Sequence, residues 1–188
     1  MEPLVPLARL WLPILLSAVI VFVVSSILHM VLKYHRTDWS KLPNEDAVLT
    51  GVRSVPPGDY MMPFPASAQE RKSPEWQEKM RREPMVVMTV MRGDMQTAFK
   101  KALGLWFVYS LVVAVFAAYI AGRTHGPATP YLEVFRVVGT VAFVGYALAL
   151  WQHSIWYGRK WSTTIKSTVD GLIYGLLTAG IFGWLWPK

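Results

Sequence analysis

Apolar residues dominate four long stretches of this chain, and charged residues are almost absent from them. A helix rises about 1.5 Å per residue, so about 20 apolar residues cover the hydrocarbon core of a bilayer, which is about 30 Å thick. Only helices and closed barrels satisfy their backbone polar groups in lipid. The pattern therefore predicts four membrane-spanning helices, over residues 10–32, 103–121, 132–152 and 169–186.

The composition supports an all-α integral membrane protein. Hydrophobic residues make up 53% of the 188 residues and charged residues only 16%, which is too apolar for an ordinary soluble domain. The length leaves room for four spans and one sizeable proline-rich loop, residues 34–102, so we expect a single membrane domain over residues 1–188. The absence of cysteine excludes disulfides and thiolate metal sites.

Basic residues collect at one end of the predicted spans. The opposite end holds only Arg9, Arg123 and Lys188. The positive-inside tendency places the basic end in the cytoplasm, with the loop on that side and both termini outside. Anionic lipid headgroups then account for the net charge of +7, so we expect no nucleic-acid partner. The residues of the basic end are Lys33, Arg36, Lys41, Lys100, Lys101, Arg159, Lys160 and Lys166.

The loop between the first two spans carries local structural signals. Ser73 followed by Pro74 predicts the start of a short helix that ends near Arg82. The valine-rich run 85–91 predicts a strand or an interfacial segment, and Asp94 predicts the cap of a helix that continues into the second span. The loop is too small and too rich in proline for a catalytic domain, so we expect it to lie on the membrane surface or against a partner.

Two of the predicted spans carry a small residue at every fourth position. This spacing places the small side chains on one face, where another helix backbone can approach closely. We expect the second span to pack against the fourth, or one of them to pack against another subunit. The helix-packing residues are Ser110, Ala114, Ala118 and Gly122 in the second span, and Gly171, Gly175, Ala179 and Gly183 in the fourth.

Few charged residues fall within or beside the predicted spans. Glu133 and Arg136 are three positions apart at the start of the third span, where they can pair, and Arg136 can extend to the interface. Asp170 follows the predicted start of the fourth span, where the helix dipole favours an acid. We interpret all three as structural. With no carboxylate predicted at mid-span, no proton or cation pathway is expected.

Two sets of residues are candidate cofactor ligands. His29 and His153, at the same-side ends of the first and third spans, could ligate haem b with one imidazole each. Met85, Met88 and Met91 could hold Cu(I) through soft thioether sulfurs. Interfacial histidines with polar partners and methionines that fill apolar gaps are the more ordinary explanations, so no cofactor is expected. His35, in the loop, is assigned no role.

Segments 34–40 and 156–162 share a pattern in which two aromatic residues precede a Trp-Ser pair. The pattern fits two parallel two-helix halves, and it also fits the usual enrichment of aromatic and basic residues at an interface. Trp156-Tyr157 followed by Trp161, after a span, resembles small uncharacterised four-span proteins of the bacterial inner membrane. The resemblance covers this segment and its flanking spans; it implies that location and brings no known activity.

Catalytic motifs are missing from the sequence. There is no phosphate-binding loop, dinucleotide-binding glycine fingerprint, His-Glu-x-x-His motif or nucleophile elbow, so we do not expect an enzyme. Two function classes remain open. The first is a non-catalytic accessory or scaffold subunit whose partners are membrane lipids and other membrane-protein subunits or itself. The second is a small homo-oligomeric transporter or channel. Haem or Cu(I) binding is a distant third.

Overall fold

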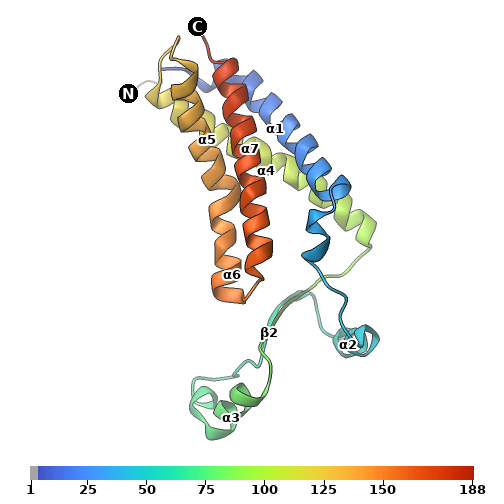
Figure 1. Ribbon diagram of the computed structural model, residues 1–188. Coiled ribbons are helices and arrows are strands. Elements are labelled where there is room, and N and C mark those ends of the chain that lie inside the picture. Colours follow the sequence, from blue (N-terminus) through green and yellow to red (C-terminus); the bar gives the residue numbers. More distant parts are fainter. Residues whose placement is uncertain (1–3) are drawn as a thin grey trace. The chain divides into compact units, whose positions relative to one another are not determined.

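A computed structural model describes residues 4–188, which are mostly helical (Figure 1). Within these residues, four helices are long and apolar enough to cross a membrane, as predicted: Leu7–Val31, Met95–Thr124, Tyr131–Tyr157 and Trp161–Trp184. They are compatible with an integral membrane protein.

The chain divides into two compact units, which are described separately below. The first, the membrane unit, comprises Met1–Ser40 and Ala98–Lys188. The second, the loop unit, comprises Lys41–Thr97.

The first span is not a uniform helix. A 3-10 turn (η1, Leu7–Leu10) precedes α1 (Trp11–Ser26), and a π-helical turn (η2, Ile27–Val31) ends the span. There the Leu32 N–H donates to the carbonyl of Ile27 at 3.1 Å, five residues back instead of four. Wide turns of this kind are rare and occur often at functional sites.

The third span is interrupted. Helix α5 (Tyr131–Ala147) is followed by a 3-10 turn (η5, Leu148–Leu150) and then by α6 (Trp151–Tyr157). Gly158 follows with φ of 67°, a left-handed conformation that suits glycine at a helix C-terminus. A single regular helix over 132–152 was the expectation, so the break is a departure from it.

The fourth span, α7 (Trp161–Trp184), begins before residue 169, where the hydropathy pattern placed its start. Its first turns are polar but partly buried. Thr163 and Thr164 are shielded, and the hydroxyls of Thr164 and Ser154 are 2.6 Å apart. The earlier start corrects the position of Asp170, which lies inside the helix and not in its first turn.

Helices α5 and α7 approach each other through glycine. A Cβ added to Gly171 would lie 2.7 Å from the Cβ of Ala147, which is too close. A Cβ on Gly175 would lie 3.2 Å from the Phe143 nitrogen and 3.3 Å from the Gly139 oxygen. The small residues of the fourth span therefore face the third span, not the second as expected.

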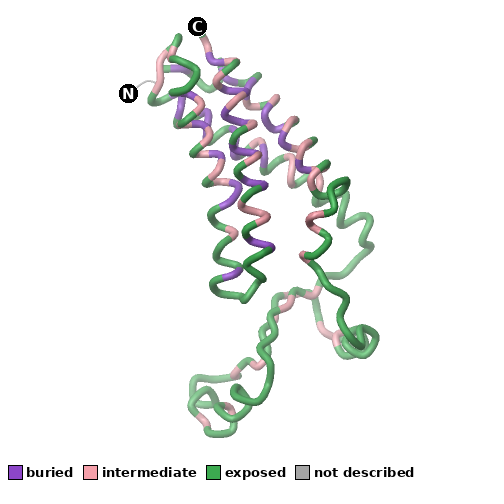
Figure 2. Tube along the Cα trace, in the orientation of Figure 1, coloured by how far each residue is buried: buried purple, intermediate pink, exposed green. Residues whose placement is uncertain are grey.

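The remaining small residues are also accounted for. Ala179 faces Gly139, and a Cβ on Gly183 would meet the ring of Tyr131, so both continue the contact with α5. On α4 (Met95–Thr124), Gly122 accepts the Val5 N–H at 2.9 Å through its carbonyl. Gly122 belongs to the stripe of small residues at every fourth position of α4, and the other three members are also buried: Ser110, Ala114 and Ala118. Figure 2 shows the buried positions of the membrane unit.

The two ends of the membrane unit differ in character. At the end that holds Val5, the Trp186 indole donates to the Gly126 carbonyl at 2.9 Å and Ala128 N–H donates to the Pro187 carbonyl at 2.8 Å. A hydrophobic cluster packs beneath these bonds: Val5, Leu10, Ala114, Ala117, Ala118, Ala121, Val134, Val138, Phe182 and Trp186. A second cluster is rich in tyrosine: Val21, Val113, Ala142, Tyr146 and Tyr174.

The loop unit contains a two-stranded antiparallel sheet, so the description as all-α holds for the membrane unit alone. Strand β1 (Gly58–Met62) pairs with β2 (Val86–Val90), and Tyr60 lies opposite Met88. The strand alternative for residues 85–91 is therefore confirmed.

Helices α2 (Glu45–Val52) and α3 (Pro74–Arg82), with the 3-10 turn η4 (Glu70–Lys72), complete the loop unit. The Ser73 hydroxyl accepts the Trp76 N–H at 3.1 Å, which confirms the predicted start of α3. Asp94 accepts the Thr97 N–H at 2.8 Å, as expected for the cap of α4, and this hydrogen bond lowers the pKa of its carboxyl.

Replacing Gly175 by leucine should destabilise the membrane unit by about 1–3 kcal/mol, because the added side chain has no space between α7 and α5. Thermal unfolding of the purified protein in detergent measures the change. Gly104→Leu is the matched control, since a Cβ at Gly104 meets nothing within 4 Å. Equal unfolding temperatures for the two variants would contradict the close α5–α7 contact.

Candidate functional site

Three polar side chains from separate segments meet in the membrane unit. His29 comes from the π-helical turn, His35 from a 3-10 turn (η3, Tyr34–Thr37) and Asp170 from α7. The Nε2 atom of His35 lies 3.0 Å from Oδ2 of Asp170, and Nε2 of His29 lies 3.9 Å from the same oxygen. Each residue offers one ligand atom within 4.8 Å of the others; these three residues are named the His–Asp cluster.

The two imidazole rings are stacked, with centroids 4.2 Å apart and planes 12° from parallel. Each ring is held through its Nδ1 atom. Nδ1 of His29 lies 3.0 Å from the carbonyl oxygen of Ser25, and Nδ1 of His35 lies 2.7 Å from Oδ2 of Asp38. A carbonyl oxygen only accepts, and an ionised carboxylate does the same, so both rings carry their proton on Nδ1.

Lys166 fastens the segment that carries His35 to α7. Its ammonium donates to the Tyr34 carbonyl at 2.6 Å, to the Thr37 hydroxyl at 2.7 Å and to Oδ1 of Asp38 at 2.8 Å. Burial opposes ionisation of Asp38, but the hydrogen bonds from Lys166 and His35 outweigh it and hold the pKa of Asp38 below its ordinary value. The Asp38 charge is therefore compensated.

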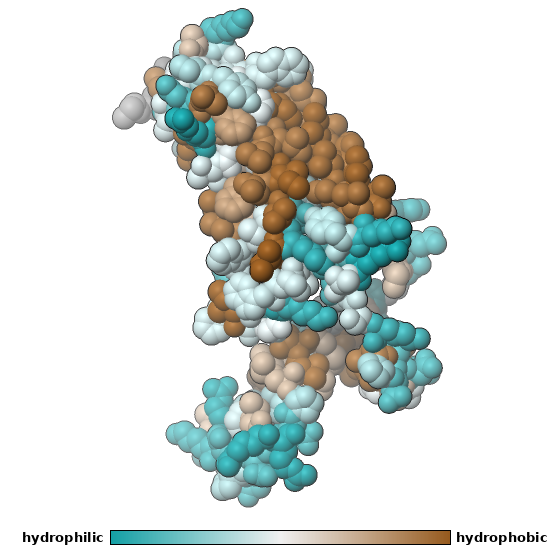
Figure 3. Space-filling view, viewed as in Figure 1, coloured by the Kyte–Doolittle hydropathy of each residue, from teal (hydrophilic) through white to brown (hydrophobic). Residues whose placement is uncertain are grey.

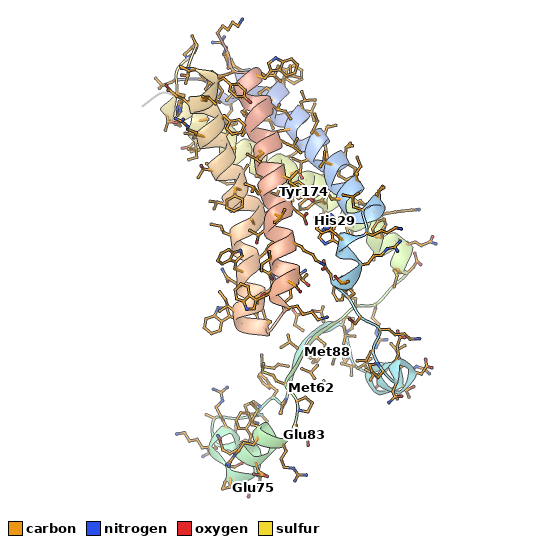
Figure 4. The ribbon with its side chains drawn as sticks, viewed as in Figure 1. His29, Met62, Glu75, Glu83, Met88 and Tyr174 are labelled. Carbon is orange, nitrogen blue, oxygen red and sulfur yellow. The ribbon has the colours of Figure 1, made fainter. Side chains whose placement is uncertain are left out.

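Asp170 has no such compensation. Its side chain is 3% exposed, and neither of its oxygens accepts a hydrogen bond from any described residue. Buried polar atoms are nearly always paired, and an unpaired carboxylate inside a membrane helix is costly. The His–Asp cluster is therefore a site that favours a positively charged ligand. Figure 4 shows His29 on the side of its turn that faces α7.

The cluster borders two cavities. The first, of about 380 Å³, is the aromatic cavity; its wall includes His29 and Asp170. The second, of about 340 Å³, includes His29 and His35. His29 lines both cavities, so small molecules or ions can approach the cluster from either. The ring-bearing residues of the aromatic cavity, besides His29, are Phe99, Trp106, Tyr109, Tyr146 and Tyr174.

Hydrogen bonds fix part of the aromatic wall. The Trp106 indole donates to the Ser25 hydroxyl at 2.8 Å, and the Tyr109 hydroxyl donates to the Gly145 carbonyl. The Tyr174 hydroxyl is buried and has no hydrogen-bond partner among residues 4–188. A polar group on a bound molecule could pair with it.

The two histidines suggested for haem have different neighbours. His29 lies with His35 and Asp170, whereas His153, in α6, has its ring centroid 6.0 Å from that of Tyr157. Of the suggested copper ligands, Met88 lies within β2, whereas Met85 and Met91 flank the strand and are exposed. The suggested copper site stays a prediction.

Glu133 and Arg136 are both exposed on α5, and within residues 4–188 they form no ion pair. Exposed pairs contribute little, so water and headgroups can solvate each charge separately. Their predicted pairing is wrong.

His35 is the member of the His–Asp cluster that the sequence did not reveal. It was assigned to a loop, and its contact with Asp170 depends on how that loop folds back onto α7. The one available signal was an aspartate in an apolar stretch with histidines near the end of another span. Among known proteins, no family model, no curated protein and no solved structure matches the chain. The role of the cluster is therefore argued from its geometry.

Removing the Lys166 charge should loosen residues 33–38. Lys166→Met leaves Asp38, which is 9% exposed, without its cation, and should cost about 2–3 kcal/mol, somewhat less than for a fully buried pair. Trypsin should then cleave after Arg36 several times faster than in the native protein. Lys160→Met, at an exposed position, should leave the rate unchanged, and adding Asp38→Asn to Lys166→Met should recover part of the protection. Unchanged cleavage in Lys166→Met would contradict the fastening role.

Proposed function

We propose that this protein is a non-catalytic, multi-pass subunit of a larger assembly in the bacterial inner membrane, and that its loop unit docks on a partner subunit. Two structural features support the proposal. The membrane unit has a closely packed pair of helices that can anchor the chain, and the loop unit is a folded segment without an interior of its own.

The lack of buried residues in the loop unit is the main support for the proposal. None of residues 41–97, all of which the structure describes, is buried. Ordering a residue costs about 1–2 kcal/mol of backbone entropy, which burial of apolar surface normally offsets. The loop unit has the apolar side chains but leaves them exposed, which marks an interaction surface: Leu42, Val48, Leu49, Met61, Met62, Phe64, Met80, Met85, Val86, Val87, Met91 and Met95.

The sheet of the loop unit supports the same conclusion. A two-stranded sheet is marginally stable by itself, and within the described residues each of its strands has an edge that pairs with no other strand and can take one more. β2 has the sequence Val-Val-Met-Thr-Val, which is well suited to such pairing. We expect the partner subunit to supply an extended segment that pairs with one edge and apolar side chains that cover the exposed ones.

A small transporter or channel is the second candidate. It is favoured by the carboxylate of Asp170, which lies within α7 and lines the aromatic cavity, because ionisable groups inside spans mark ion pathways. The glycines of α7 do not add support, since they face α5 within the chain and not a pore.

The expected orientation puts the basic end of the membrane unit in the cytoplasm and both termini outside. Lys33 and Arg159 follow the first and third spans at one end, while the hydrogen bonds of Val5 with Gly122 and of Ala128 with Pro187 lie at the other. Figure 3 shows a broad hydrophobic surface over α1, as a lipid-facing helix requires.

The orientation can be tested with single cysteines, because the chain has none of its own. An impermeant maleimide added to intact cells with a permeabilised outer membrane should label Thr124→Cys and should not label Ser67→Cys, both at exposed positions. Lysis should make both reactive. Labelling of Ser67→Cys in intact cells would reverse the orientation.

Purification in mild detergent should yield the protein together with a different polypeptide. Val87→Asp, which places a charge on the exposed face of β2, should reduce that co-purification at least about tenfold, since a desolvated unpaired charge costs several kcal/mol. Ala68→Asp, at an exposed position of the same unit, is the control and should keep the partner. A single polypeptide that elutes as a symmetric oligomer, unaffected by either variant, would favour the transporter or channel.

A further inference from the structure

We propose that His29, His35 and Asp170 together bind one divalent transition-metal ion, with Zn²⁺ as the representative case. The ligand atoms are Nε2 of each histidine and the carboxylate of Asp170. This inference does not depend on the loop unit or on a partner subunit.

The first argument is the direction of the imidazole protons. Nδ1 of His29 donates to the Ser25 carbonyl, and Nδ1 of His35 donates to Asp38. A neutral ring that donates from Nδ1 presents a lone pair on Nε2, the arrangement in which histidine binds a metal. Both lone-pair nitrogens lie within 4.8 Å of the Asp170 oxygen, which also only accepts when ionised. With neutral rings and an ionised Asp170, three acceptor atoms thus gather at one point.

The second argument is that two of the three residues, His35 and Asp170, carry buried polar atoms without a hydrogen-bond partner. Nε2 of His35 and both oxygens of Asp170 make no hydrogen bond with any part of the described chain. This holds although Nε2 and Oδ2 are only 3.0 Å apart, so the contact is not aligned for a hydrogen bond. Unpaired buried acceptors of this kind are costly. A cation bound between His35 and Asp170 would pair Nε2 of His35 and an oxygen of Asp170 at once.

The distances suit a small ion. Bonds of about 2.0–2.2 Å in tetrahedral geometry place ligand atoms about 3.3–3.6 Å apart. The separations of Nε2 from Oδ2, 3.0 Å for His35 and 3.9 Å for His29, fall on either side of that value. The His29 ring must tilt out of its stack with His35 to point Nε2 at the ion. Its side chain is 51% exposed, so it has the freedom to do so.

The surroundings of the ligands are those of a metal site. A histidine that binds a metal usually donates its other N–H to a carboxylate or a backbone carbonyl, which orients the ring and raises its basicity. His35 has the carboxylate of Asp38, itself fixed by Lys166, and His29 has the Ser25 carbonyl. The Lys166 charge is matched by Asp38, so the Asp170 charge remains for the ion.

The donor set selects the class of metal. Two imidazoles and one carboxylate suit Zn²⁺, Fe²⁺ or Co²⁺, whereas Mg²⁺ and Ca²⁺ favour oxygen ligands and Cu(I) favours sulfur. Three protein ligands leave at least one coordination position open. His29 and Asp170 both line the aromatic cavity, so an open position there could take water or a small polar ligand.

Titration of the full-length protein in detergent with Co²⁺ tests the proposal. We expect one Co²⁺ per chain, visible absorption bands of the intensity typical of four- or five-coordinate cobalt, and displacement by Zn²⁺. Asp170→Asn, which preserves size, should weaken Co²⁺ binding about 100-fold or more. His153→Ala, a histidine outside the cluster, should leave the affinity and the spectrum unchanged.

A measurement on the native protein tests the proposal even if one of the variants does not fold. X-ray absorption of the Zn²⁺-loaded protein should report two imidazole ligands and oxygen in the remaining positions. The proposal is overturned if the folded native protein binds no stoichiometric Co²⁺ or Zn²⁺, which would leave a proton as the occupant of the cluster. It is also overturned if Asp170→Asn binds as tightly as the native protein, or if His153→Ala loses binding to the same extent.

Discussion

The close approach of α5 and α7 is the contact on which the rest of the membrane unit depends. Gly171 and Gly175 let the backbones approach closely, because an added Cβ would lie 2.7 Å from the nearest α5 atom at Gly171 and 3.2 Å from it at Gly175. In lipid there is little hydrophobic force between helices, so such packing has to supply the association. The contact also fixes the rotation of α7 about its own axis. Asp170, next to Gly171, is thereby held off the α5 interface and within reach of the two histidines.

The His–Asp cluster is assembled by three irregularities and not by regular helix geometry. The π-helical turn alters the register of the last turn of the first span, where His29 lies. The 3-10 turn that follows carries His35 back toward α7, and Lys166 holds that turn in place through three hydrogen bonds. A regular helix through residue 35 would carry this histidine away from Asp170. The polar centre is therefore inseparable from the irregular end of the first span.

The sequence predicted the features that depend on local composition. Four apolar runs gave the number of spans, Ser73 gave the start of α3 and Asp94 gave the cap of α4. Features that depend on distant contacts were not predictable. The first turns of α7 are polar and are partly buried through contacts such as that of Thr164 with Ser154. Hydropathy does not register such contacts, so the predicted start of the helix was too late and Asp170 was misplaced. The contact of His35 with Asp170 joins residues far apart in the chain, and no periodicity encodes it.

The packing partner of the small-residue stripe was misassigned for a related reason. A stripe shows which face of a helix is smooth, but it does not show which other helix meets that face. Gly139 and Ala147 on α5 complement the stripe of α7 and are eight positions apart, but the large Phe143 lies midway between them, so the sequence shows no continuous row of small residues there. The break after Ala147 was likewise invisible to hydropathy, because Leu148–Leu150 continues the apolar run.

The exposed loop unit should affect how fast the protein is degraded in the cell. A segment that lacks an interior opens readily, and open backbone is what proteases cut. Under our proposal that the loop unit docks on a partner, copies made in excess of that partner would be degraded, while bound copies would be shielded. In that way the abundance of this chain would follow the abundance of whatever covers residues 41–97, without any dedicated regulator.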